Sequence, residues 1–262
     1  MRAAHQLLDA SPHILEDPLA VALLGPVGVQ RVYDTADAYH SPKRRALRAH
    51  VVLRSRFAED RLAAALAREV TQYVILGAGF DTFALRRPVW AQSLKIFEVD
   101  HETTQEVKRS RIAAAGLAMP ENAHFAAVDF EHEPLQDGLR RHAISLDELT
   151  FFSWLGVTMY LEEDAIDAVL RSVAAFPTGS EIVLTYAPPP GDSPSPFDER
   201  AASLGEPWKS YFEPDALSAK LHGAGFSTVE FLSPAEAEAR YFRQRPQDLP
   251  IPTRTNIACA IR

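Results

Sequence analysis

The stretch Gln72-Tyr-Val-Ile-Leu-Gly-Ala-Gly-Phe-Asp81 decides the fold of this chain. Gln72 to Leu76 form a short apolar run, which is typical of a strand that is buried on both faces of a parallel sheet. Gly77, Ala78 and Gly79 follow at once, and glycine lets a backbone approach a ligand that a Cβ atom would push away. Because ligands bind beyond the carboxyl ends of the strands in open parallel sheets, this junction is the first candidate site.

Further apolar runs alternate with helical patterns along the rest of the chain. We expect strands over residues 93–99, 124–128, 149–155, 181–186, 228–232 and 256–261. We expect helices over residues 43–67, 103–116, 162–175 and 215–223. This alternation predicts an α/β fold with a mostly parallel sheet and helices on both faces. The last two strands are close enough in sequence to pair.

The other segments suggest how a single domain is organised. Prolines and glycines cut the first forty residues into short pieces, and we interpret residues 1–68 as an N-terminal helical cap. Residues 69–187 would form the core, and residues 215–262 would complete it. The proline-rich segment within residues 188–214 is either a plain surface loop or a lid over the site.

The composition excludes several classes of protein. The chain has 262 residues, of which 47% are hydrophobic and 24% charged, an ordinary balance for a globular protein. Its net charge of −8 disfavours binding to nucleic acid or to an anionic membrane. Apolar runs such as residues 151–161 are too short to span a membrane, and the N-terminus does not resemble a signal peptide, so we expect a cytoplasmic protein. One cysteine and scattered histidines predict no disulfide and no metal site.

Acidic residues end two further strands. Asp100 comes 21 residues after Gly79, where a carboxylate can accept hydrogen bonds from ribose hydroxyls. Asp129 and the adjacent Phe130 suit an adenine, since the carboxylate can accept from the exocyclic amine while the ring packs on the base. Either acid alone would also suit a helix cap. Thr82 stands where a dinucleotide fingerprint needs a third small residue, so S-adenosylmethionine fits better than NAD.

The chain resembles the leucine carboxyl methyltransferase family, a branch of the class I S-adenosylmethionine-dependent methyltransferases. The similar stretches are YVILGAGFDTFALRRP (73–88), FEVDHETTQEVK (97–108), AVDFE (127–131) and FFSWLGVTMYL (151–161), in that order. The resemblance implies a Rossmann-like fold with a mostly parallel seven-stranded sheet, an N-terminal helical extension and a lid insertion. Most bacterial members resemble small-molecule O-methyltransferases.

The resemblance also implies which residues bind the cofactor. They are Gly77, Ala78, Gly79 and Asp81 beside the methionine part, Asp100 and His101 at the ribose, and Asp129 and Phe130 around the adenine. A lysine and an arginine hold the cofactor carboxylate in this family, and they correspond to Lys43 and Arg54. Arg48 and Arg56 are alternatives, because any of these guanidinium groups suits a carboxylate.

Two positions depart from the family pattern. Phe83 stands where many relatives have an arginine, and Leu155 stands where eukaryotic protein-methylating members have a glutamate. Leu155 therefore disfavours a protein C-terminus as the substrate. Tyr160, Trp208 and Tyr211 are candidate substrate contacts, although aromatic residues at these places can equally pack in the core.

The sequence thus favours a methyltransferase that uses S-adenosylmethionine to methylate a carboxylate or hydroxyl oxygen of a small molecule. A carboxylate is already ionised and needs no general base, and no residue is assigned as one. The alternatives are carboxyl methylation of a protein C-terminus, an NAD-dependent oxidoreductase, and a non-catalytic protein that binds an adenosine cofactor. A small-molecule substrate is the one partner we expect, and the sequence indicates no oligomeric state.

Overall fold

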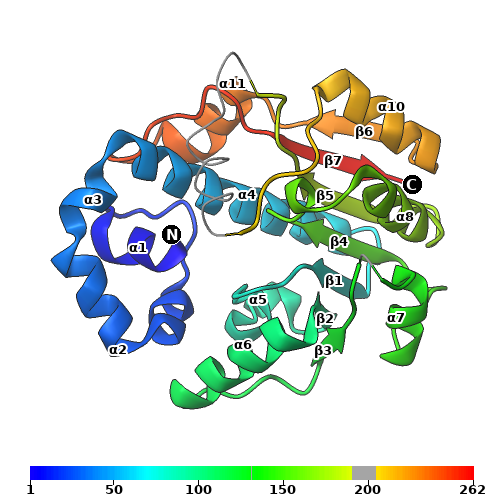
Figure 1. Cartoon of the computed structure of the whole chain (residues 1–262), viewed down its shortest axis with the longest axis horizontal. Coiled ribbons are helices and arrows are strands. Elements are labelled where there is room, and N and C mark those ends of the chain that lie inside the picture. Colours follow the sequence, from blue (N-terminus) through cyan, green and yellow to red (C-terminus); the bar gives the residue numbers. More distant parts are fainter. Residues whose placement is uncertain (131, 191–204) are drawn as a thin grey trace.

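A seven-stranded sheet forms the centre of the part of the chain that the computed structural model describes, residues 1–130, 132–190 and 205–262 (Figure 1). The strands are β1 (Gln72–Leu76), β2 (Lys95–Asp100), β3 (Ala123–Ala127), β4 (Thr150–Trp154), β5 (Glu181–Thr185), β6 (Thr228–Phe231) and β7 (Ile257–Ile261). Their order is β3-β2-β1-β4-β5-β7-β6, and only β7 runs antiparallel to its neighbours. The predicted mostly parallel sheet is confirmed. Most of the predicted lid, residues 191–204, lies outside the described residues.

Helices cover both faces of the sheet. They are α1 (Arg2–Leu8), α2 (Pro18–Asp34), α3 (Ala36–His40), α4 (Pro42–Leu66), α5 (Phe83–Arg86), α6 (Glu102–Ala114), α7 (Leu135–Arg141), α8 (Glu163–Ala174), α10 (Pro214–Ala224) and α11 (Pro234–Ala237). Shorter helical turns are η1 (Val89–Ala91), η2 (Thr158–Tyr160) and η3 (Glu238–Phe242). Within the described residues, none of these helices combines the length and the apolar character that crossing a membrane requires.

Strand β1 lies between two hydrophobic cores. Tyr73 and Ile75 pack in the core that includes buried residues of α4, whereas Val74 and Leu76 pack in the core formed with α7, α8 and α10. Both sets of side chains are therefore buried, which explains why the sequence of this strand shows no alternation of polar and apolar residues.

The sheet has a topological switch point beside β1. The chain passes from β1 outward to β2 and β3, and then returns to form β4 on the other side of β1. Leu76 pairs with Val99 of β2 and with Trp154 of β4, so the three strands end at the same level. The loops that follow β1 and β4 diverge there, which is where ligands bind in open α/β sheets.

The N-terminal residues form short helices, as the prolines and glycines of this region predict. Helices α1, α2 and α3 lie together at one end of the molecule, where α4 begins (Figure 1). Gly25 has a φ of +74°, outside the helical region, and is followed by Pro26, so these two residues divide α2 into two helical segments joined at a kink.

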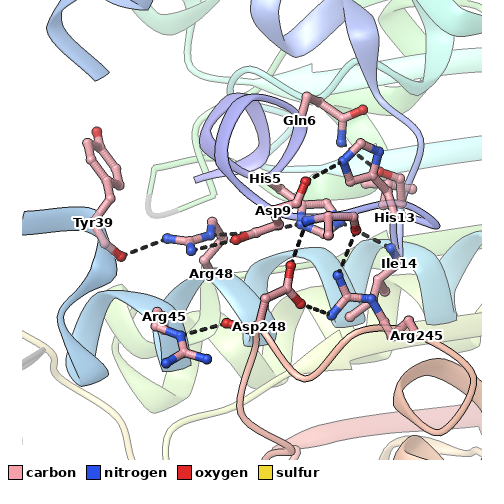
Figure 2. Close-up of polar contacts among 12 residues, drawn as sticks. His5, Gln6, Asp9, His13, Ile14, Tyr39, Arg45, Arg48, Arg245 and Asp248 are labelled. Carbon is pink, nitrogen blue, oxygen red and sulfur yellow. Dashed lines mark hydrogen bonds and ion pairs between the residues drawn. The ribbon is translucent and has the colours of Figure 1, made fainter. Parts of the chain in front are cut away.

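A buried ion pair fastens this N-terminal region to α4 (Figure 2). Arg48 is fully buried and donates from Nε and Nη2 to the two carboxylate oxygens of Asp9, each at 2.7 Å. His5 contacts the same carboxylate through Nδ1, also at 2.7 Å, and its Nε2 accepts from the N–H of Ile14 at 3.1 Å. Because Nε2 accepts, the proton of this neutral imidazole is on Nδ1 and is donated to Asp9.

A second contact joins the N-terminal segment to the loop before β7. Asp248 accepts from the N–H of Ala10 at 2.6 Å and from Nη1 of Arg245 at 2.7 Å (Figure 2). Arg45 of α4 donates to the carbonyl oxygen of Asp248 at 2.6 Å. Helix α4 is therefore held by contacts to segments near both ends of the chain.

We expect Arg48→Ala to lower the free energy of unfolding by about 3–5 kcal/mol, because it leaves the carboxylate of Asp9 buried without its charge partner. Arg56→Ala is the matched control on the same helix, since Arg56 makes an exposed pair with Asp60 and its loss should cost no more than about 1 kcal/mol. Urea denaturation of both variants measures the difference. Equal losses would contradict the structural role of Arg48.

Candidate active site

The loop after β1 keeps its main chain open toward a cavity. Gly77 and Gly79 have φ values of +66° and +48°, in the left-handed region that favours glycine. A Cβ atom on Gly77 would lie 2.3 Å from Cγ2 of Val157, whereas one on Gly79 would meet no atom closer than 4.0 Å. Ala78 is buried between them. The space beside Gly79 is therefore available to a ligand.

Asp81 connects this loop to two helices. Its Oδ1 accepts from the N–H of Phe83 at 2.7 Å, and its Oδ2 accepts from Nη1 of Arg2 at 2.9 Å. Arg2 also donates to the carbonyl oxygen of Phe80 at 2.8 Å. Burial alone would raise the pKa of Asp81, but nearby positive charges, Arg2 first among them, lower it to about 2. The carboxylate is therefore ionised and fixes the loop against α1.

Asp100 and Asp129 lie at the ends of neighbouring strands. Asp100 accepts from the N–H of Gly79 at 2.6 Å and from the N–H of His101 at 2.7 Å. Asp129 lies two residues beyond β3, where its Oδ2 is 2.9 Å from Nδ1 of His132 and 3.8 Å from Nε2 of His101. The two acids and His101 thus share one edge of the sheet, next to the glycine loop.

Phe130 and His101 complete this edge. Phe130 is half-buried, and its ring makes an edge contact with Trp154 at a centroid distance of 6.5 Å. His101 is the N-cap of α6, with its Nδ1 accepting from the N–H of Thr103 at 3.3 Å. The imidazole therefore has a structural role that does not depend on a ligand.

Two cavities adjoin where β1 and β4 end. The smaller, about 220 Å³, is lined by the glycine loop, Arg2 and residues after β4. The larger, about 380 Å³, lies between α4 and the segments after β4 and β5. Val51, Arg54 and Gly156 line both cavities. Asp100, His101, Asp129 and Phe130 line neither, so the edge that they form lies outside both cavities.

The basic residues of α4 separate into different environments. Arg48 is occupied by Asp9, and Arg56 pairs at 2.8 Å with a carboxylate one turn later. Lys43 is exposed and precedes Arg54 by eleven residues, or roughly 16 Å along the helix at 1.5 Å per residue. Lys43 is not among the described residues that line either cavity, although Ala46, one turn later, lines the larger one. Of the four candidates for the cofactor carboxylate, Arg54 is the one that lines both cavities.

Arg54 has no charge partner within the described part of the chain. Its Nε is buried and makes no hydrogen bond. Burial, followed by the charge of Arg2, lowers the pKa of the guanidinium to about 10. A Cβ atom on Gly156, whose φ is +79°, would lie 2.6 Å from both Nη atoms of Arg54, so the absence of a side chain there makes room for the guanidinium.

The larger cavity has an aromatic lining. Tyr160 and Trp208 line it, together with Tyr186. Tyr211 does not line the cavity, and its ring is tilted against that of Trp208 with 6.2 Å between the centroids. The structure thus brings two of the three predicted substrate contacts to this cavity.

Several residues that the sequence did not single out contribute to the two cavities. Arg2 and Gly156 line the smaller one, and His50, Gly156 and Asn256 line the larger. Burial, with a smaller contribution from Arg54, lowers the pKa of His50 to about 3, so its imidazole is neutral at physiological pH. Gly156 comes shortly after β4, as Gly77 comes after β1. A glycine just beyond a predicted strand could therefore have identified Gly156 from the sequence. Arg2 and Asn256 approach from the two ends of the chain, without a local motif.

Comparisons with known proteins find a matching family and several relatives. The family model of the leucine carboxyl methyltransferases matches residues 1–174. YktD of Bacillus subtilis (strain 168), named as an S-adenosyl-L-methionine-dependent methyltransferase, is 34% identical over 209 residues, which cover 75% of this chain and 67% of that protein. A Mycobacterium marinum (strain ATCC BAA-535 / M) protein named in the same way is 29% identical over 207 residues, which cover 76% of this chain and 67% of that protein.

A solved structure supports the fold. The crystal structure of a protein from Thermobifida fusca YX, titled as a methyltransferase, matches with a TM-score of 0.58 over 92% of this chain and 91% of that chain. The two sequences are 18% identical, so this likeness concerns the fold alone. The chain spans about two thirds of the length of the two relatives described above.

We expect Gly156→Ala to weaken binding of S-adenosylhomocysteine about tenfold or more, because its Cβ atom would displace the guanidinium of Arg54. Gly116→Ala is the matched control, since Gly116 has a similar φ of +66° but no atom within 4 Å of the added carbon. Both variants carry the same kind of backbone strain, and only the first carries the clash. Calorimetric titration of the two variants isolates that clash, and an equal loss in both would contradict the role of Gly156.

Proposed function

Because this chain belongs to the leucine carboxyl methyltransferase family of S-adenosylmethionine-dependent methyltransferases, we propose that it methylates an oxygen atom of a small molecule held in the larger cavity. The observation that carries this proposal is the pair of adjoining cavities that share Val51, Arg54 and Gly156. The methionine part of a cofactor in the smaller cavity and an acceptor in the larger one would meet at this boundary. Methyl transfer needs such a meeting, with the nucleophile in line and water excluded.

The residues present fit the cofactor. The unpaired guanidinium of Arg54 would hold the carboxylate of the methionine part, and the open main chain at Gly79 would lie beside it. Asp100 would accept from the ribose hydroxyls, while Asp129 and Phe130 would border the adenine. When bound, S-adenosylmethionine supplies an electrophilic methyl group on a sulfonium. The protein's part is to bind, align and exclude water.

The lining of the larger cavity favours a carboxylate over a hydroxyl as the acceptor. His50 is the side chain there that would ordinarily serve as a base near neutral pH, but the pKa of about 3 makes it a very weak one. Glu206 is exposed. An acceptor that arrives already ionised needs no proton removed, and carboxylic acids meet this condition at neutral pH.

The alternative substrates and roles are less well supported. A protein C-terminus would have to enter a cavity that is lined mainly by apolar and aromatic side chains, and Leu155 replaces the glutamate of the protein-methylating members. A non-catalytic role would leave the second cavity, and its boundary at Arg54, without a function.

We expect purified protein to transfer radiolabelled methyl groups to monocarboxylic acids and not to the matched alcohols, for example to 4-isopropylbenzoate and not to 4-isopropylbenzyl alcohol. The reason is that the described residues provide no effective base for the alcohol. Methylation of alcohols alone would assign the reaction to hydroxyl groups. If S-adenosylhomocysteine binds while a broad panel of both classes stays unmethylated, the non-catalytic alternative would be correct.

We expect Arg54→Met to have opposite effects on stability and on binding. It removes a recessed charge without a partner, so the free energy of unfolding of the unliganded protein should rise by about 1–3 kcal/mol. It also removes the group proposed for the cofactor carboxylate, so S-adenosylhomocysteine should bind less tightly. Arg44→Met, which removes the same charge from a position outside both cavities on the same helix, should change neither quantity appreciably. Loss of both stability and affinity in Arg54→Met would mean that Arg54 is structural.

A further inference from the structure

His50 lies on the side of α4 that forms one wall of the larger cavity. The residues of this helix that line the cavity are Ala46, Leu47, His50, Val51 and Arg54. At about 100° per residue their side chains spread over about 140° of the helix circumference, and His50 lies between Ala46 and Arg54 within this arc. The side chain of His50 is half-buried, so part of its ring is accessible from the cavity that it lines.

One ring nitrogen of His50 is used within the fold. The imidazole donates a hydrogen bond to the carbonyl oxygen of Thr255, in the loop before β7. Thr255 is buried, and its Oγ1 donates to the carbonyl oxygen of Leu232. The carbonyl oxygen of the next residue, Asn256, accepts from the N–H of Tyr186 at 3.2 Å. Because the partner of His50 is held on both sides, the ring and its tautomer are fixed before a ligand arrives.

The other ring nitrogen of His50 is open to a ligand. It makes no hydrogen bond within the described residues, and it is not one of their buried polar atoms that lack a partner. Burial, followed by the charge of Arg54, lowers the pKa of His50 to about 3, so this nitrogen carries a lone pair at physiological pH. With its single proton given to Thr255, the neutral imidazole can only accept a hydrogen bond from a ligand.

His50 differs in this respect from the other polar groups of the lining. The hydroxyl groups of Tyr160 and Tyr186 and the amide of Asn256 can both donate and accept, so they do not distinguish a ligand donor from a ligand acceptor. Glu206 only accepts, but it is exposed. A ligand group that contacts the open nitrogen of His50 must therefore be a donor.

The place of His50 along α4 determines where on the acceptor this donor must be. Arg54, the residue assigned to the cofactor carboxylate, marks the boundary of the two cavities, whereas His50 lines the larger one alone. His50 precedes Arg54 by four residues, or roughly 6 Å along the helix at 1.5 Å per residue. A carboxylate at the boundary and a donor at His50 would therefore be about one helical turn apart on the acceptor.

Building on the proposed function, we propose that the acceptor is a hydroxy acid, whose carboxylate is methylated at the boundary and whose uncharged hydroxyl group, about one helical turn away, donates to His50. His50 is then a residue that determines specificity and not a base, because the hydroxyl that it binds is not the group that reacts. An acid with a methyl group in place of this hydroxyl would leave the ring nitrogen covered and unpaired, which weakens binding.

Three benzoates test this proposal. They are 4-hydroxybenzoate, 4-methylbenzoate and 2-hydroxybenzoate. The first carries a donor at the far end of the ring, the second carries an apolar group of similar size there, and the third carries its donor beside the carboxylate. Each is titrated calorimetrically into protein saturated with S-adenosylhomocysteine. We expect 4-hydroxybenzoate to bind about five- to tenfold more tightly than either of the others, the equivalent of one neutral hydrogen bond.

Substitution of histidine locates the effect. His50→Phe should bind 4-hydroxybenzoate and 4-methylbenzoate with equal affinity. His40→Phe, the same change at an exposed histidine that lines neither cavity, should keep the preference. Because His50 does not line the smaller cavity, unchanged binding of S-adenosylhomocysteine shows that His50→Phe is folded.

A spectrum of the wild-type protein reports on the same contact. The chain has nine histidines, and comparison with His50→Phe assigns the ring signals of His50 after ¹⁵N labelling. The signal of its unprotonated nitrogen should move on addition of 4-hydroxybenzoate, because that nitrogen then accepts a hydrogen bond. The same signal should stay in place with 4-methylbenzoate.

The proposal is overturned if wild type binds 4-hydroxybenzoate and 4-methylbenzoate equally, if 2-hydroxybenzoate binds most tightly, if none of the three binds, or if His50→Phe keeps the preference. Transfer of the methyl group to the hydroxyl of 4-hydroxybenzoate would also overturn it. Failure of the proposed function appears separately, as absence of S-adenosylhomocysteine binding or of methyl transfer to any acid.

Discussion

The two cavities depend on one buried charge that the protein leaves without a partner. Arg54 extends from the middle of α4 to the point where β1 and β4 diverge, and no carboxylate of the described residues neutralises it. A buried cation without a partner destabilises the folded protein, and the lowered pKa of the guanidinium has the same cause. A ligand carboxylate would remove this destabilisation. We therefore interpret Arg54 as a charge kept in place for binding.

The rest of the structure holds this charge in position. Arg48, on the same helix, is fully paired with Asp9, and this ion pair fixes α4 against the N-terminal segment. Gly156 leaves room for the guanidinium at the end of β4. Arg2 is paired with Asp81 and therefore supports the glycine loop. Neighbouring arginines thus serve opposite purposes, because some are neutralised within the fold and one is not.

The sequence predicts the sheet and the glycine loop well, because both follow from local patterns. Spacing alone is enough to recognise the apolar run Gln72–Leu76, the glycines after it, the acid that ends β2 and the acid shortly after β3. The choice among Arg48, Arg54 and Arg56 is not readable in this way. It depends on which carboxylates approach each arginine, and Asp9 reaches Arg48 from 39 positions away. The prediction for Lys43 depended on the family motif, and the structure leaves this residue exposed on the first turn of α4.

The central claim is that Arg54 is kept for the carboxylate of the cofactor. The most direct test compares S-adenosylhomocysteine with its decarboxylated counterpart, which differs only at that group, by calorimetric titration of wild type and Arg54→Met. We predict that wild type prefers the intact compound by roughly 10- to 100-fold, as for a charge-assisted hydrogen bond, and that Arg54→Met binds the two alike. Equal binding by wild type, or an unchanged preference in Arg54→Met, would contradict this claim.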